Sequence, residues 1–153
     1  MSRHNFFPKD DYSNYNVVVG WDRGLSSFFF QYGDVCSDLP LNLSTGQRYA
    51  EHQEPDVVVA LAIHFASSVP ADLVDRLLAD RENEGSYSDI SAPLNVTFST
   101  QADNGDEVNT EVSRDSLKDM SGVAAVAEWV LHQFDVDEIE AWDQENGPPQ
   151  GNA

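Results

Sequence analysis

The sequence predicts an α+β fold, in which an antiparallel β-meander and a β-hairpin pack with an αα-hairpin and C-terminal helices. Segments rich in β-branched and aromatic residues flank turn-forming residues, both near the N-terminus and after residue 90. Between these segments, apolar residues recur at helical spacing. Hydrophobic residues make up 41% of the 153 residues and charged residues 23%, which is typical of a globular domain.

The first expected hairpin joins residues 15–21, which read Tyr-Asn-Val-Val-Val-Gly-Trp, to residues 28–32, which read Phe-Phe-Phe-Gln-Tyr. Residues 22–24, Asp-Arg-Gly, provide the turn. Residues 47–54 are expected to form a polar loop. Before that loop, alternating leucines predict a weaker third strand ending at residues 44–46, and these leucines are Leu39, Leu41 and Leu43.

Two helices are expected next, as an αα-hairpin packed on the sheet. Pro55 suits a first helical turn, and apolar residues follow at Val57, Leu61 and Phe65. A buried strand would also suit residues 57–64, so we favour the helix and leave the strand open. The second helix begins near Pro70, ends near Glu84-Gly85 and has an apolar face made of Leu73, Val74, Leu77 and Leu78.

The second hairpin is predicted in a defined register. A two-residue Asn104-Gly105 turn would place Phe98 opposite Glu111. Because side chains alternate with a period of two, the apolar residues of the two strands would then lie on different faces of the hairpin. A three-residue loop, Asp103-Asn104-Gly105, avoids this and puts Gly105 at the left-handed position of a bulged turn. The predicted pairs are then Val96 with Val112, Phe98 with Thr110 and Thr100 with Val108.

One or two helices should complete the chain. The first has an apolar face made of Val123, Val126, Ala127, Val130 and Phe134. A second, short helix follows if Asp135 and Glu138 form a capping box. The expected organisation is an N-terminal arm (1–14), a single α+β domain (15–145, with a possible sub-boundary near 85–92) and a flexible tail (146–153).

The charge of the chain is unevenly distributed. It has 27 acidic and eight basic residues, for a net charge of -19, and 22 of the acids lie beyond residue 50. This disfavours direct contact with nucleic acid or anionic lipid, and favours a basic partner or plain solvation. No apolar run approaches the length of about 20 residues that a membrane-spanning helix needs. With one cysteine, Cys36, and no expected signal peptide, a cytoplasmic location is predicted, although a disulfide-free periplasmic protein would look the same.

Residues 15–29 resemble the opening of small uncharacterised bacterial proteins of plasmids and integrative elements, which begin with an NVVxGWDRPLxxFF-like stretch. This segment reads Tyr15-Asn16-Val17-Val18-Val19-Gly20-Trp21-Asp22-Arg23-Gly24-Leu25-Ser26-Ser27-Phe28-Phe29. Residues 69–81 resemble a helix of the same family. The resemblance covers residues 15–82, with Gly24 in place of the usual proline, and residues 90–153 have no counterpart in it. It implies a mobile-element setting and no particular chemistry.

Motifs for catalysis or cofactor binding are absent from the sequence. Neither a phosphate-binding glycine loop nor a G-x-S-x-G nucleophile elbow occurs. No spacing supports a thiolate–imidazole pair of Cys36 with His52 or His64. The histidines lack metal-site spacing, and the segment Asp103–Glu107 has its glycine in the wrong place for an EF-hand. We predict no catalytic residue, cofactor or metal site.

The remaining candidate is the acidic segment, defined as residues 135–145. It combines six acids and no base with an apolar stripe, and its candidate partner-binding residues are Asp135, Asp137, Glu138, Ile139, Glu140, Trp142, Asp143 and Glu145. Two further acidic clusters could join it on one face: Asp80/Glu82/Glu84/Asp89 and Asp103/Asp106/Glu107/Glu111.

The leading hypothesis is a non-catalytic interaction protein of a mobile genetic element. In its sharper form the acidic surface imitates nucleic acid and inhibits a basic host or defence protein. Two alternatives stay open. One is a small hydrolase or metal-dependent enzyme that uses Asp22, Arg23 and a nearby histidine. The other is a salt-adapted domain whose acidity has no recognition role. The sequence does not identify the partner or the oligomeric state.

Overall fold

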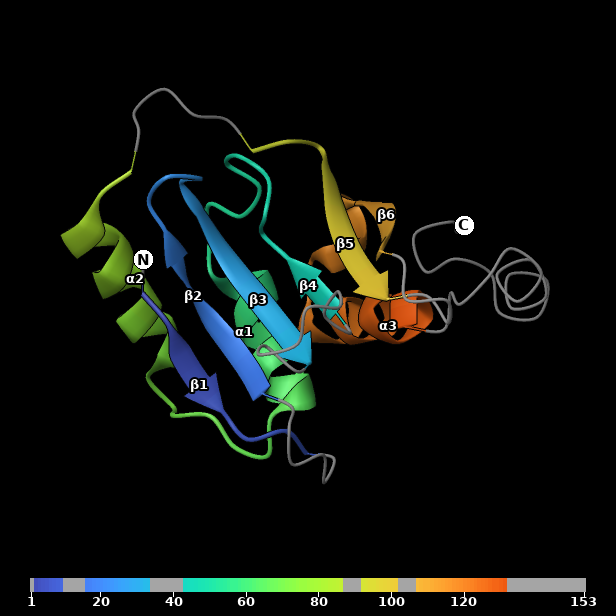
Figure 1. Cartoon of the computed structure of the whole chain (residues 1–153), viewed down its shortest axis with the longest axis horizontal. Coiled ribbons are helices and arrows are strands. Elements are labelled where there is room, and N and C mark those ends of the chain that lie inside the picture. The colour runs from blue at the N-terminus through green and yellow to red at the C-terminus, as the bar shows by residue number, and fades with distance from the viewer. Residues whose placement is uncertain (1, 10–15, 34–42, 87–91, 102–106, 132–153) are drawn as a thin grey trace.

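The computed structural model describes residues 2–9, 16–33, 43–86, 92–101 and 107–131. Within these ranges, six strands form one antiparallel sheet and lie side by side in chain order. The strands are β1 His4–Phe6, β2 Asn16–Asp22, β3 Ser27–Gly33, β4 Leu43–Thr45, β5 Asn95–Gln101 and β6 Glu107–Ser113. Helices cover one face of the sheet (Figure 1), so the predicted α+β class is confirmed.

Strands β2 and β3 form the predicted N-terminal hairpin. Its register places large residues opposite one another on the helix-covered face: Val17 with Tyr32, Val19 with Phe30 and Trp21 with Phe28. The turn is closed by Asp22, whose carboxylate accepts a hydrogen bond from the Leu25 N–H at 3.2 Å. Edge strand β1 was not predicted; it lies in the expected arm of residues 1–14 and pairs with β2.

The second hairpin, β5 and β6, has the predicted register. Its pairs are Val96 with Val112, Phe98 with Thr110 and Thr100 with Val108. The predicted loop at 103–105 lies outside the described residues, as do residues 39–42 of the predicted third strand. Strand β4 pairs with β5 at Leu43–Thr100 and Ser44–Ser99, so the sheet runs continuously across the possible sub-boundary near 85–92.

Three helices follow the predicted positions closely: α1 Asp56–Phe65, α2 Leu73–Glu84 and α3 Met120–Leu131. A short 3₁₀ helix, η1 Arg114–Leu117, was not predicted. The helix favoured over the strand at 57–64 is confirmed. Helix α1 packs against β2, β3, α2 and α3, and most of its residues are buried. Because nearly every side of α1 is apolar, hydrophobic periodicity alone did not distinguish it from a buried strand.

Helices α2 and α3 are amphipathic, and each faces the sheet with part of its predicted apolar surface. Leu73 and Leu77 of α2 are buried, whereas Val74 is 37% exposed and does not belong to the buried face. Helix α3 buries Val123, Val126, Ala127, Trp129 and Val130; Phe134 lies outside the described residues. Helix α2 ends at Gly85, whose φ of 84° suits glycine and matches the predicted end.

The C-terminal end of α2 is anchored to the hairpin. Trp21 is fully buried, and its indole N–H donates to the carbonyl of Gly85 at 2.9 Å. The Trp21 and Phe28 rings meet edge to face with centroids 4.7 Å apart. The Arg81 guanidinium lies 5.7 Å from the centroid of the Phe28 ring and donates to the carbonyl of Gln53 at 2.5 Å. These contacts link α2, the hairpin and the loop at 47–54.

Gly46 turns the chain away from the sheet at the end of β4. Its φ is +87°, and a Cβ atom there would lie 2.1 Å from the carbonyl oxygen of Phe28. Both facts exclude a side chain, because the left-handed conformation is unfavourable for other residues and the neighbouring backbone does not move easily.

We therefore expect Gly46→Ala to lower the free energy of unfolding by at least about 2 kcal/mol, from backbone strain and the clash with β3. Gly24→Ala, in the β2–β3 turn, is the control, since its nearest neighbour is a side-chain oxygen of Asp22 at 3.3 Å. Urea denaturation of the two variants measures the difference. Equal losses of stability would show that the close approach at Gly46 is not a constraint.

Candidate functional site

All the residues predicted to bind a partner lie outside the described part of the chain. They are Asp135, Asp137, Glu138, Ile139, Glu140, Trp142, Asp143 and Glu145. Cys36 also lies outside, so its pairing with a histidine is not tested. The structure does place Leu131, the last residue of α3, four positions before the acidic segment.

The other two acidic clusters do not share a face. Asp80, Glu82 and Glu84 lie on α2, which packs over β2 on the helix-covered side of the sheet. Glu107 and Glu111 lie at the other edge, on β6, and are exposed. Because their neighbour Val112 points into the core, they point away from the helices. The described members of these clusters are therefore on opposite faces of the sheet. They also lie toward opposite edges, since Figure 1 shows α2 and β6 at opposite sides of the sheet.

Of the two residues proposed for a hydrolase, Asp22 takes part in the β2–β3 turn through its carboxylate and Arg23 through its backbone carbonyl. Asp22 accepts the Leu25 N–H, and the carbonyl of Arg23 accepts the backbone N–H of Ser26 at 3.0 Å. Within the ranges that the structure describes, no group of three or more His, Cys, Asp or Glu side chains is placed to hold a metal ion. Among the same residues, no helix is both long and apolar enough to cross a membrane.

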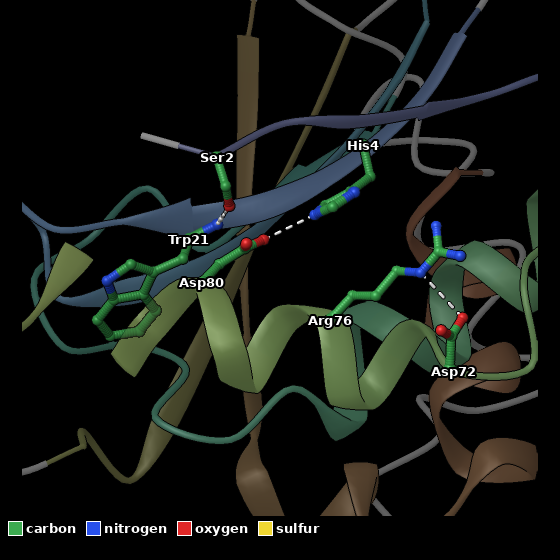
Figure 2. Close-up of polar contacts among 6 residues, drawn as sticks. All are labelled: Ser2, His4, Trp21, Asp72, Arg76 and Asp80. Atoms are coloured by element: carbon green, nitrogen blue, oxygen red, sulfur yellow. Dashed lines mark hydrogen bonds and ion pairs between the residues drawn. The ribbon is translucent and has the colours of Figure 1, made fainter. Parts of the chain in front are cut away.

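Polar contacts attach the edge strand β1 to the sheet and to α2. Figure 2 shows the His4 ring directed at Asp80 of α2, with Nε2 2.7 Å from the carboxylate. In the same view, the hydroxyl of Ser2 accepts the backbone N–H of Trp21 at 2.8 Å. Arg76 lies nearby but pairs with Asp72, one turn earlier on the same helix, at 2.9 Å. This cluster is explained by its role in holding β1.

A second polar cluster is deeply buried, at the point where β4 and β5 separate. The register that pairs Ser44 with Ser99 would place Gly46 opposite Thr97. Both of these residues donate a backbone N–H to the fully buried carboxylate of Glu51, Gly46 to Oε1 at 2.7 Å and Thr97 to Oε2 at 3.0 Å. The carboxylate thus replaces the backbone hydrogen bonds that a further β4–β5 residue pair would make, and it satisfies two buried N–H groups.

His52 joins this cluster through Thr45. The Thr45 hydroxyl oxygen lies 3.0 Å from the carbonyl of Thr97, 3.3 Å from Glu51 Oε1 and 2.9 Å from His52 Nε2. A hydroxyl has one proton, and here both the carbonyl and the carboxylate compete for it. Its oxygen must therefore accept the third bond, from the Nε2–H of His52. In this tautomer the other ring nitrogen, Nδ1, carries a free lone pair.

Arg114 ties η1 to the loop that carries Glu51 and His52. Its Nη2 donates to the carbonyl of Glu51 at 2.6 Å, and its Nε donates to the carbonyl of Pro93 at 3.0 Å. Burial lowers the pKa of the guanidinium, and the negative charge of Glu51 opposes that shift. Burial, helped by the positive charge of Arg114, lowers the pKa of His52 from 6.5 to about 3. The ring is thus neutral at physiological pH.

His52 and Arg114 line a cavity of about 320 Å³ between the N-terminus of α1 and η1. The cavity has an apolar part formed by Val57 and Leu117, and Lys118 also lines it. His52 is only 1% exposed, and its Nδ1 has no hydrogen-bond partner among the described residues. The lining also includes the carboxylates of Glu54, Asp56 and Asp115, so acidic side chains outnumber the two cationic ones, Arg114 and Lys118.

Sequence reasoning missed this cluster. It treated residues 47–54 as a polar loop, and they do form a loop, but Glu51 and His52 within it are buried. The sequence suggested for His52 only a pairing with Cys36 or, with the other histidines, a metal site, and supported neither. Nothing in the local sequence indicates burial, because the partners of Glu51 lie on β4 and on the distant strand β5.

Comparisons of the chain with protein-family models, with curated proteins and with solved structures find no match.

Replacing the Glu51 carboxylate by an amide should destabilise the fold. Glu51→Gln leaves one acceptor oxygen for two backbone N–H groups and directs an NH₂ group at the second. We expect a loss of roughly 3 kcal/mol in the free energy of unfolding, measured by urea denaturation. Glu54→Gln, an exposed residue of the same loop, should change stability by less than about 0.5 kcal/mol. A small effect of Glu51→Gln would contradict the role assigned to the carboxylate.

The low pKa of His52 predicts a pH dependence. Between pH 6.5 and about 3 the unfolded chain binds a proton at His52 that the folded protein does not bind. Stability should therefore fall as the pH falls through this window, by about 1.4 kcal/mol per pH unit from this group. Because many carboxylates titrate in the same range, the test compares the slope of unfolding free energy against pH near pH 5 for the wild type and for His52→Gln. Identical slopes would argue against a neutral, buried His52.

Proposed function

We propose that the protein is a non-catalytic acidic interaction protein of a mobile genetic element, and that it acts in the cytoplasm by binding a basic partner through its acidic segment. The carrying observation is where the acidic and basic residues lie along the chain. The described residues contain all eight basic residues and 14 of the 27 acids, a net charge of -6. The other 13 acids have no base among them, and six lie in residues 135–145.

The attachment of the segment supports this proposal. Helix α3 packs against α1, β5 and η1, and its residues Val126, Ala127 and Val130 are fully buried. The segment therefore follows an element fixed in the core. The negative charge of the segment would steer a basic surface toward the protein, and Ile139 and Trp142 would supply apolar groups for close contact.

The sharper form of the proposal is that the segment imitates nucleic acid toward a DNA- or RNA-binding protein. The positions of Glu107 and Glu111, on the face opposite to α2, do not favour a single acidic surface formed jointly with Asp80. The mimicry is therefore restricted to the acidic segment. The mobile-element setting comes from the resemblance of residues 15–82.

The salt-adapted alternative has an observation in its favour. Exposed acids of the described body occur on α1, α2 and η1 and on the opposite face of β6, which is the even spread that solvation alone would give. Solvation and partner recognition make different predictions about charge. Solvation depends on the total charge, whereas recognition depends on where the charge is.

This difference defines the test. The tagged full-length chain is used to capture proteins from a bacterial lysate at about 50 and 500 mM salt, where the Debye length differs about threefold. We expect capture of basic proteins that is lost at the higher salt, and lost at either salt with Asp137→Lys, Glu138→Lys and Glu140→Lys combined. The control combines Glu82→Lys, Glu107→Lys and Glu111→Lys, which makes the same charge change on the exposed body.

Retained capture in the control and loss in the segment variant would support recognition by the acidic segment. Equal loss in both would favour a general charge effect, and capture that ignores salt would contradict the proposal. A captured protein that also binds duplex DNA, and releases it on adding the acidic chain, would support the mimicry.

A further inference from the structure

We infer that a groove on the helical layer binds a basic amphipathic helix of a partner protein. The groove has a volume of about 270 Å³ and is lined by residues of α1, α2, η1 and the start of α3. The acidic segment takes no part in this site, so the inference does not depend on the proposed function. The packing of the helices, the apolar side chains and the charge of the groove each select one property of the partner.

The packing of the helices creates the groove. Helix α1 packs more closely against α3 than against α2, which packs mainly on β2. Val59 and Ala60 of α1 and Val123 of α3 form the buried part of the lining. Ile63 lies one turn beyond Val59 and Ala60 on the same face of α1. From Asp56 to Ile63 the helix rises about 10 Å, which is the distance that apolar residues at i, i+4 and i+7 of a partner helix span.

Exposed apolar side chains select an apolar face on the partner. Met120 is 52% exposed, Ile63 38% and Val74 37%. Val74 belongs to α2 and Met120 to α3, so two helices contribute exposed apolar groups to one groove. Such groups gathered beside a buried apolar surface are typical of an interaction site. The flexible thioether of Met120 also adapts to the shape of a partner side chain.

Carboxylates at the groove select positive charge on the partner. Asp56 and Asp119 line the groove and are exposed. Asp56 forms no ion pair with any residue that the structure describes. Lys118 also lines the groove, but its ammonium group lies 3.8 Å from the carboxylate of Asp115, which balances its charge. Lysine or arginine residues that flank the apolar face of a partner helix would therefore be attracted to the groove.

The same charges disfavour two other occupants. A second copy of the chain carries a net charge of -19 and would be repelled. The chain's own acidic segment is long enough to return along α3, because a helix of 12 residues rises about 18 Å and an extended chain covers about 3.3 Å per residue. Its six acids, however, would approach Asp56 and Asp119. A basic helix has neither disadvantage.

The test titrates the full-length protein into a fluorescently labelled peptide of about 15 residues, with leucines at i, i+3, i+4 and i+7 and lysines and alanines elsewhere. Anisotropy should show saturable binding with a Kd of about 100 µM or tighter. Two matched peptides should each bind at least about tenfold more weakly. One has the same composition with its leucines spread around the helix, and the other has glutamate in place of lysine.

Methionine methyl NMR locates the bound peptide. The chain has two methionines, Met1 and Met120, and Met120 lines the groove. We expect the Met120 methyl resonance to shift along the same binding curve as the anisotropy, with Met1 as the internal reference. Saturation of the anisotropy without a shift of Met120 would overturn the inference.

Variants of the groove test the same point. Met120→Lys and Val74→Lys change exposed residues, so neither should disturb the core, and each should weaken binding of the leucine–lysine peptide at least about tenfold. Leu94→Lys is the matched control, because Leu94 is exposed and does not line the groove. It makes the same change in charge and should alter the Kd less than about twofold.

The acidic segment and a second copy are distinguished by further outcomes. The combined lysine variant of the acidic segment should bind the peptide within about threefold of the wild type. Loss of binding in that variant, with binding retained in Met120→Lys and Val74→Lys, would place the peptide on the segment and overturn the inference. Tighter peptide binding after Trp142→Ala would identify the segment as the occupant of the groove. A wild-type dimer that Met120→Lys dissociates would identify a second copy, and either result would overturn the inference.

Discussion

The buried carboxylate of Glu51 joins the two parts of the sheet. The pairing of β4 with β5 is short, and β4 turns away at Gly46 because its φ is positive and β3 lies against it. A sheet that separates at this point would leave the N–H groups of Gly46 and Thr97 buried and unpaired. Glu51 supplies one carboxylate oxygen to each of them. Its charge is tolerated because those two N–H groups and the nearby Arg114 compensate for the loss of water.

The position of Glu51 also fixes the groups around the cavity. His52 follows it directly and is held on both sides, by the Thr45 hydroxyl at the ring and by Ser27 and Phe28 at the backbone. The carbonyl of Glu51 receives Arg114, which brings η1 against the N-terminus of α1. The residues that stabilise the sheet thus also hold the His52 ring and the Arg114 guanidinium in place. This buried cluster and the acidic segment are separate features, one fixed in the body and one beyond α3.

Most of the fold was predictable because it depends on local patterns. The register of β5 and β6 followed from alternation, since only one register places Val96 and Val112 on the same buried face. Helix α1 was ambiguous for a physical reason: it is buried on most sides and lacks a polar face. Strand β1 was missed because three residues at an edge carry little pattern, and its stability comes from partners such as Asp80 that are distant in the chain.

The buried cluster was not predictable in the same way. Polar residues in a loop are usually exposed, and the loop at 47–54 fits that rule at Gln47, Arg48 and Tyr49. Glu51 and His52 are exceptions because they are buried at the point where β4 and β5 separate, and the residues that meet there, such as Thr45 and Thr97, are 52 residues apart in the sequence. The acidic segment was the clearest functional feature of the sequence, and the role proposed for it follows from its composition.

Native-state hydrogen exchange of two backbone amides, those of Gly46 and Thr97, tests the central claim most directly. If the Glu51 carboxylate closes the sheet, both amides should exchange only through global unfolding, as slowly as the amides of the β2–β3 hairpin. Fast exchange of Gly46 and Thr97, at rates typical of a surface loop while the hairpin stays protected, would show that the carboxylate does not hold the two parts of the sheet together.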